Sequence, residues 1–176
     1  MAGHVDSPYR AILGLAFETL HPHVQRAHLA PLDARGTMTV DRGAHPLTPL
    51  LAKLLKLPGA GAGQPVELSV RAAKRGELVW TRQIGSSSLE TRQISRGRRL
   101  VETNGLGSVA FDLIAEDGTL LYRQVSMRCG GLPLPGVLAP RVAASVSPAE
   151  SGWVVTVIVT WRGHLICRYT GCMRQT

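Results

Sequence analysis

The chain has 176 residues, a length that suits one domain with a sizeable hydrophobic core. Hydrophobic residues make up 44% of the chain, which excludes a disordered protein, and aromatic residues only 5%, so the core must be mainly aliphatic. The formal net charge is +8, and only three of the 20 basic residues are lysines. That balance fits an acidic partner, and it equally fits the arginine bias of a GC-rich genome.

The cysteine pattern and the apolar runs indicate a cytoplasmic protein without a membrane span. The three cysteines, Cys129, Cys167 and Cys172, cannot all pair with one another and show no CxxC spacing. The N-terminus has no basic run followed by an apolar stretch, so no signal peptide is expected. The longest run of apolar residues and threonines, Trp153–Trp161, is far shorter than the roughly 20 residues of a membrane helix.

The first third of the chain, residues 7–57, is predicted to be mainly helical. Residues 7–20 combine an N-cap at Ser7 with apolar residues at helical spacing. A second amphipathic helix is predicted for Leu47–Leu57, which a proline begins and a Pro-Gly pair ends. Between the two helices, Ala34–Arg42 alternates as a strand with one buried face.

The remainder, residues 65–170, is predicted to be β-rich. Pro65–Ala72 alternates apolar and polar residues, as several later segments do. Asp117-Gly118 is a hairpin signal, which predicts that Ser108–Glu116 and Leu120–Cys129 pair as antiparallel strands.

These elements predict a single α+β domain over residues 1–176. We expect a strongly bent antiparallel sheet or a β-barrel of about 8–10 strands, with the two N-terminal helices covering one side. The proline-rich segment Gly130–Val142 is predicted to be an ordered crossover outside the sheet. Its leucines Leu132, Leu134 and Leu138 are expected to be buried.

Charged residues on the predicted strands are the candidates for a functional site. An ionised side chain that faces the inside of a closed sheet must be paired or change its protonation state. Asp112 and Glu102 are predicted as catalytic acid or base, with Asp112 the best inward candidate because it shares a face with apolar neighbours. The predicted ligand-binding residues are Arg123, Arg92, Arg128 and Trp80. Arg123 and Asp112 lie on the two strands of the Asp117-Gly118 hairpin, and a pair that only stabilises the sheet is the alternative interpretation.

Neither a metal site nor a cofactor is predicted. The histidines His21, His23 and His28 are spaced by two and five residues, whereas ligands on one helical face need a spacing of four. The glycine-rich run 59–63 follows a helix and precedes a strand, the reverse of a phosphate-binding loop.

Several segments together resemble an uncharacterised bacterial family, a domain of unknown function found alone or fused behind saccharopine-dehydrogenase-like oxidoreductases. The segments are YRAILG, LHP, RGTMTVDRG, LLAKLLKLP, GLPLPGVLAPRV and LICRYTG. The resemblance runs from about Tyr9 to Gly171, and it implies a single α+β domain of bacterial origin but no catalytic residues. Asp112 departs from the pattern, since its strand position is one where Arg, Glu or a neutral polar residue is expected.

The leading hypothesis for function is a β-barrel-like cavity that binds a small, largely apolar or aromatic molecule. Such a cavity could serve an acid/base-assisted cyclisation, condensation or isomerisation in specialised metabolism, and the sequence leaves open whether the protein is an enzyme. The first alternative is a non-catalytic module that serves an oxidoreductase as an accessory or presents substrate to it. The partners considered besides the small-molecule ligand are an oxidoreductase and a second copy of the chain. The second alternative is weak, nonspecific nucleic-acid binding, which the +8 charge permits but no motif supports.

Overall fold

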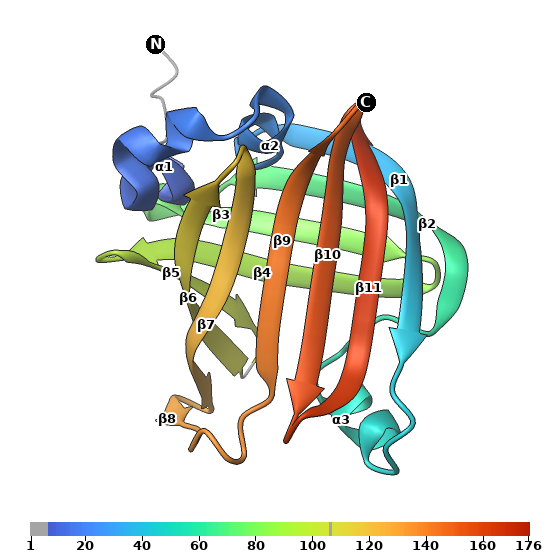
Figure 1. Cartoon of the computed structure of the whole chain (residues 1–176). Coiled ribbons are helices and arrows are strands. Elements are labelled where there is room, and N and C mark those ends of the chain that lie inside the picture. Colours follow the sequence, from blue (N-terminus) through green and yellow to red (C-terminus); the bar gives the residue numbers. More distant parts are fainter. Residues whose placement is uncertain (1–6, 106) are drawn as a thin grey trace.

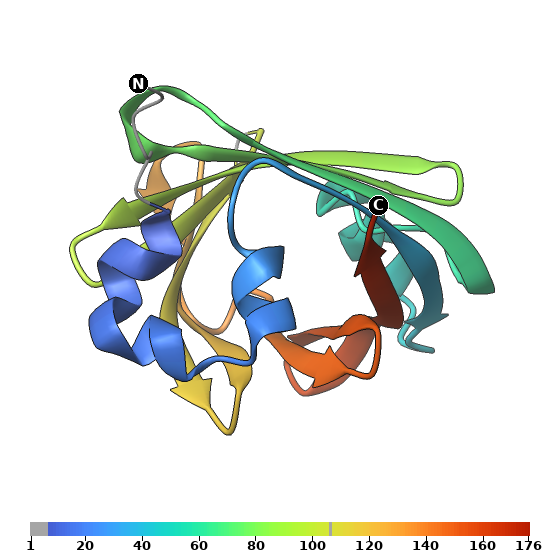
Figure 2. The ribbon, with the colours of Figure 1, turned by 90° about the horizontal axis from the view of Figure 1, so that it is seen from above.

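A single antiparallel sheet of eleven strands dominates the computed structural model, which describes residues 7–105 and 107–176 (Figures 1 and 2). The strands are β1 (Leu32–Arg42), β2 (Gly61–Ala72), β3 (Leu78–Ile84), β4 (Ser87–Arg96), β5 (Arg99–Asn104), β6 (Gly107–Glu116), β7 (Thr119–Cys129), β8 (Leu132–Pro133), β9 (Arg141–Ala149), β10 (Gly152–Trp161) and β11 (His164–Gln175). Their order is β6-β5-β4-β3-β2-β1-β11-β10-β9-β7-β8, and β6 also pairs with β7. That last pairing closes ten strands into a barrel, with the short β8 added beside β7, so the predicted barrel is confirmed.

The hairpin that closes the barrel forms where the sequence predicts it. Strands β6 and β7 pair from Gly107 opposite Cys129 to Glu116 opposite Thr119. The turn residues Asp117 and Gly118 both have positive φ, 47° and 74°. Two positive φ values are typical of a type I′ turn, whose twist matches that of the flanking strands.

The helices lie at both ends of the barrel. They are α1 (Pro8–Leu13), the 3-10 helix η1 (Gly14–Thr19), α2 (Pro22–Ala27), α3 (Thr48–Leu54) and the 3-10 turn η2 (Lys74–Gly76). Ser7 caps α1 as predicted, because its hydroxyl accepts a hydrogen bond from the Tyr9 amide. The helix predicted over residues 7–20 is nevertheless split, since Gly14 has φ 55° and ends α1.

The prediction that both helical regions cover one side is wrong. Helices α1 and α2 cover one end of the barrel, whereas α3 lies at the other end (Figure 1). The reason is the connection: β1, which joins α2 to α3, runs from one end of the barrel to the other.

A large part of the buried core lies beneath α1 and α2. Alternation along the strands turns one set of apolar side chains inward, where they meet residues of the helices. Fully buried members include Tyr9, Phe17, Val24, Leu32, Val70, Leu78, Leu100 and Leu120. Apolar side chains from helices and wall therefore seal this end of the barrel.

The proline-rich segment is less buried than the sequence suggests. Leu132 is 73% and Leu138 54% exposed, and Leu134 is only half-buried. Leu132–Pro133 also joins the sheet as β8, against Arg128 and Cys129 of β7. The segment turns back on itself beyond the end of the barrel, with the Leu138 amide bonded to the Pro135 carbonyl. Leu132 and Leu138 therefore have no wall to pack against.

Strands β1 and β11 approach so closely that two positions exclude any side chain. A Cβ atom added at Gly36 would lie 1.9 Å from the Cys172 carbonyl oxygen, and one at Gly171 would lie 2.1 Å from that of Thr37. These two strands pair from Ala34 opposite Gln175 to Arg42 opposite Cys167. The pairing joins the first and last strands of the chain and completes the barrel wall.

We predict that Leu134→Ala lowers the free energy of unfolding by less than about 1 kcal/mol, because a half-exposed side chain leaves no cavity when it is shortened. Leu100→Ala, at a fully buried position, should cost about 2–5 kcal/mol. Urea denaturation of both variants measures the difference. Equal losses would show that the proline-rich segment belongs to the core after all.

Candidate functional site

A series of hydrogen-bonded, mostly buried polar side chains links the end of the barrel covered by α1 and α2, which we call the helical end, to the barrel wall. Tyr9 of α1 donates its hydroxyl hydrogen to Gln93 Oε1 on β4 at 2.5 Å. Tyr122 Oη on β7 lies 3.1 Å from Tyr9 Oη and 2.7 Å from His28 Nε2, just after α2. His28 Nδ1 in turn lies 2.7 Å from the Val24 carbonyl oxygen. Three of these groups, Tyr9, His28 and Gln93, are almost completely buried.

The series continues to an ion pair on the inner face of the barrel. Gln93 Nε2 donates to Glu102 Oε2 on β5 at 2.9 Å. Arg82 Nη1 on β3 lies 3.5 Å from Glu102 Oε1 and donates to Thr91 Oγ1 at 3.0 Å. The Arg82 and Glu102 side chains keep 20% and 22% of their surface exposed, although their neighbours Trp80 and Gln93 are buried. Solvent therefore reaches this ion pair.

Aromatic rings surround the buried part of the series. We call Tyr9, His28, Trp80, Phe111 and Tyr122 the aromatic cluster, since ring centroids within it lie 4.5–6.4 Å apart. The Arg82 guanidinium lies 5.0 Å from the centroid of the Trp80 ring. Trp80 Nε1 is buried and has no hydrogen-bond acceptor among the described residues. A buried donor without a partner costs free energy, so Trp80 Nε1 adds an unsatisfied polar group to the interior beside Arg82.

Burial determines the protonation states of His28, Tyr9 and Tyr122. It lowers the pKa of His28 to about 4, so the imidazole is neutral at pH 7. Burial also raises the pKa of the Tyr9 and Tyr122 hydroxyls, which therefore keep their protons. The Val24 carbonyl can only accept, so His28 carries its proton on Nδ1 and Nε2 is an acceptor.

While His28 is neutral, the hydrogen-bonded side chains from His28 to Gln93 have one hydroxyl hydrogen fewer than they have hydrogen-bond contacts. Tyr122 has a single hydroxyl hydrogen, and both His28 Nε2 and Tyr9 Oη lie within hydrogen-bonding distance of it. The Tyr9 hydrogen cannot fill the gap, because it is donated to Gln93. Protonation of His28 would satisfy every contact, with each group donating to the next towards Gln93. These side chains can thus take up a proton at His28 and keep all of their hydrogen-bond contacts.

The structure separates the sequence-predicted site residues into two groups. Glu102 and Trp80 lie on the inner face, in the arrangement just described. Asp112 lies on the outer face, where its Oδ1 is 3.2 Å from Arg99 Nε and its side chain is 49% exposed. It stands opposite Arg123 in the β6–β7 pairing, as expected from the hairpin. The predicted inward orientation of Asp112 is wrong, because Phe111 takes the inward position on β6.

The three predicted arginines also lie on the outside of the barrel. Arg92 pairs with Glu77 at 3.4 Å and with Glu90 at 3.9 Å. Arg128 donates to the Gly131 carbonyl at 3.4 Å. These contacts account for both side chains without a ligand.

The residues missed by sequence reasoning come largely from the helical end. Tyr9 fits an apolar helical stripe, and His28 is notable in the sequence only as one of three clustered histidines. Arg82 gives a usable signal, since it follows Trp80 by two residues and so shares its face.

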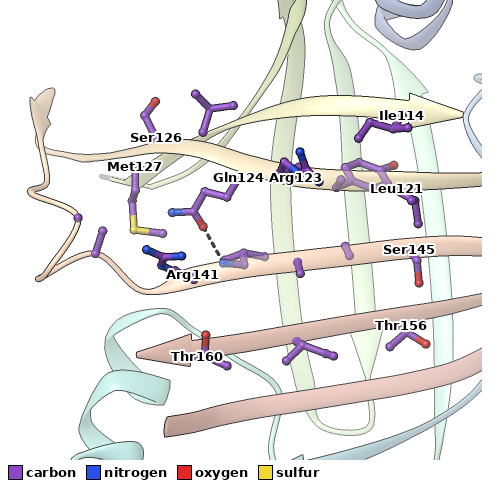
Figure 3. A pocket seen from close by; sticks show the side chains of 18 of the residues that line it. Ile114, Leu121, Arg123, Gln124, Ser126, Met127, Arg141, Ser145, Thr156 and Thr160 are labelled. Carbon is purple, nitrogen blue, oxygen red and sulfur yellow. Dashed lines mark hydrogen bonds between the residues drawn. The ribbon is translucent and has the colours of Figure 1, made fainter. Parts of the chain in front are cut away.

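A shallow hollow of about 800 Å³ lies on the outer wall where β7 and β9 separate (Figure 3). The pairing of these strands ends at Arg123 opposite Ala143. Beyond this pair, the Gln124 side chain replaces the backbone pairing between the strands. It accepts a hydrogen bond from the Val142 amide at 2.6 Å and donates one to the Pro140 carbonyl at 2.9 Å. The hollow is lined in part by Ile114, Leu121, Arg123, Arg141, Ile158 and Thr160. It is broadly open, and of the predicted residues it includes Arg123.

No group of three or more His, Cys, Asp or Glu side chains within residues 7–105 and 107–176 is placed to hold a metal ion. Over the same residues, every helix is too short or too polar to cross a membrane.

Comparisons with known proteins gave one family match and one similar fold. Residues 20–173 match the profile of a family described as a domain of unknown function, DUF4166. A search of curated proteins gave no match. The crystal structure of a protein with unknown function from the DUF3598 family of Nostoc punctiforme PCC 73102 has a similar fold, with a TM-score of 0.53 at 12% identity. The similarity covers 85% of this chain and 54% of that one, so this chain matches about half of the larger protein.

We predict that the buried His28 makes the protein less stable as the pH falls from about 6.5 to about 4. In this window unfolded His28, with its ordinary pKa near 6.5, binds a proton that the folded state still rejects. The free energy of unfolding should drop by on the order of 3 kcal/mol from this group, and the loss should level off below pH 4. Denaturant titrations at several pH values measure it. His28→Gln should remove this part of the slope, whereas His23→Gln, at a half-buried position, should keep it; identical slopes in both variants would contradict the assignment.

Proposed function

The chain belongs to the DUF4166 family, and we propose that its barrel binds a small, mainly apolar or aromatic molecule whose polar group contacts Arg82 and Glu102. The observation that carries this proposal is a solvent-accessible ion pair on the inner face of the barrel, beside a buried aromatic cluster. A barrel that combines aliphatic walls with a few convergent polar groups is a common form of small-molecule site.

Stability alone does not explain the ion pair. Charges taken out of water lose several kcal/mol of solvation each, and apolar residues of similar size would often be as stable. Arg82 Nη1 and Glu102 Oε1 lie 3.5 Å apart, which is a long contact for an ion pair, and both side chains stay partly exposed. Both groups therefore remain able to bind a ligand atom.

The surroundings indicate which ligand chemistry fits. The Arg82 guanidinium can donate to a carboxylate, phenolate or carbonyl oxygen, and the Glu102 carboxylate can accept from a hydroxyl group. Trp80 Nε1 is a further donor, for which residues 7–105 and 107–176 provide no acceptor. Half-buried inward residues such as Val109, Val142 and Val157 provide apolar contacts. A planar or aliphatic molecule with one oxygen-bearing end can contact the two donors, the Glu102 carboxylate and the apolar wall.

We propose acid/base chemistry as an extension of binding. Glu102 would remove a proton from a bound molecule, and Arg82 would stabilise the negative charge that develops on its oxygen. Such a pair serves isomerisation and cyclisation, the reaction types anticipated from the sequence. The proposal uses Glu102 and not Asp112, because Asp112 is engaged by Arg99 on the outer face.

We predict that naphthalene-2-carboxylate, an aromatic acid, binds inside the barrel and shifts the indole N–H resonance of Trp80 in NMR spectra. Arg82→Gln should weaken its binding at least about tenfold, because the charge-assisted contact to the carboxylate is lost. Arg92→Gln removes an arginine from the outer face of the neighbouring strand and should leave binding unchanged. Assignment by Trp80→Phe identifies the resonance, and circular dichroism checks that each variant is folded.

Either of two results would contradict the interior site. One is equal weakening by Arg82→Gln and Arg92→Gln, and the other is binding that leaves the Trp80 resonance unmoved. Native mass spectrometry of protein purified from its own host should in addition reveal a retained molecule that Arg82→Gln no longer carries.

A further inference from the structure

The end of the barrel opposite α1 and α2 carries most of the exposed large apolar side chains. We call it the α3 end and define it by residues 43–60, 127–141 and 161–165. Of eight such side chains among the described residues, six belong to it: Leu47, Leu50, Leu54, Leu132, Val137 and Leu138. Leu54 and Leu132 are 75% and 73% exposed. An apolar surface of this kind usually has a partner.

The charge of the α3 end is entirely positive. Its exposed cations are Lys53, Lys56, Arg128, Arg141 and Arg162. None of the 12 acidic residues of the chain falls within the three segments that define it. The surface therefore combines exposed leucines and valines with five exposed cations.

Contacts around Trp161 join the separate segments into one surface. Its Nε1 donates to the Leu138 carbonyl oxygen at 3.2 Å, which holds the proline-rich loop against the end of β10. On the other side, the ring of His45, just before α3, lies 6.0 Å from the Trp161 ring and 4.5 Å from that of His164. In Figure 1, α3 and β8 lie at the same end of the barrel. The apolar residues of loop and helix can thus meet one flat partner together.

We propose that the α3 end is a docking surface for a membrane that contains anionic lipids. Exposed leucines and valines enter the boundary between headgroups and acyl chains, while Lys and Arg side chains contact the negative headgroups. Nucleic acid would match the charge but not the six apolar side chains. A partner protein would have to supply acidic groups around an apolar centre, whereas an anionic bilayer presents both layers at once. This proposal does not depend on a ligand inside the barrel.

Vesicle co-sedimentation tests the proposal with two lipid mixtures, pure phosphatidylcholine and phosphatidylcholine with 30% phosphatidylserine. We predict binding to the anionic vesicles that is at least about tenfold stronger than to the neutral ones. Raising the salt concentration to about 0.5 M should weaken it, because the headgroup attraction is screened. The double variant Lys53→Gln/Lys56→Gln should weaken binding, whereas Lys74→Gln/Arg75→Gln, in the distant β2–β3 turn, should not.

The apolar contribution has its own matched control. Leu50→Ser/Leu54→Ser and Val137→Ser/Leu138→Ser should each reduce binding at least about tenfold, and both pairs are exposed, so the fold is retained. Leu15→Ser alters a leucine that is 90% exposed on η1, at the opposite end, and should have no effect.

Three outcomes would overturn the proposal: no binding to anionic vesicles, binding that the α3-end variants do not change, or equal loss with Leu15→Ser. Sedimentation velocity of the protein alone tests for a fourth such outcome, which is self-association. A dimer that the α3-end variants dissociate would assign this surface to a second copy of the chain. Tight RNA binding lost in the lysine variant but kept in the leucine variant would assign it to nucleic acid.

Discussion

Hydrogen bonding among buried polar groups holds the helical end on the barrel, and the interior arrangement depends on it. Tyr9 and His28 come from the helical end, while Tyr122, Gln93 and Glu102 come from the wall. Tyr9, His28 and Gln93 are almost completely buried, so the loss of one of them leaves its neighbour unpaired, at a cost of roughly 1–3 kcal/mol. The same contacts that fix α1 and α2 over the core also orient Gln93 towards Glu102. Fold and candidate site thus share one set of interactions.

Local sequence signals predicted the elements better than their arrangement. The Asp-Gly turn and the alternation around it specify the β6–β7 hairpin, because two-residue turns constrain both strands directly. No local sequence signal indicates which end of a barrel a helix covers, so the sequence does not predict the position of α3. The proline-rich segment shows the same limit. Its composition predicts that it leaves the sheet, but only the position of the barrel end decides that Leu132 and Leu138 have nothing to pack against.

The orientation of site residues was predictable only on strands with one clearly apolar face. On β3, Leu78, Trp80 and Ile84 share a face with Arg82, so the inward position of Arg82 follows from alternation. Both faces of β6 are apolar, with Val109, Phe111 and Leu113 on one and Ala110 and Ile114 on the other. Alternation therefore places Asp112 with Ala110 and Ile114 but cannot say that this face is the outer one. The contribution of Tyr9 and His28 was hidden for a different reason, since helix and barrel wall meet only in the folded chain.

The pairing of β1 with β11 determines when this protein can fold. Residues 34–42 find their partners at 167–175, so the wall stays incomplete on a ribosome until more than 120 further residues have followed β1, and residues 167–175 have been synthesised. Until then, β1 and β10 each expose an unpaired strand edge, which is a template for association with other chains. Contacts between distant parts of a sequence also slow folding, since the entropy of a long loop is lost before the contact forms. Synthesis at low temperature or with chaperones that shield strand edges should therefore favour the monomeric barrel over aggregates.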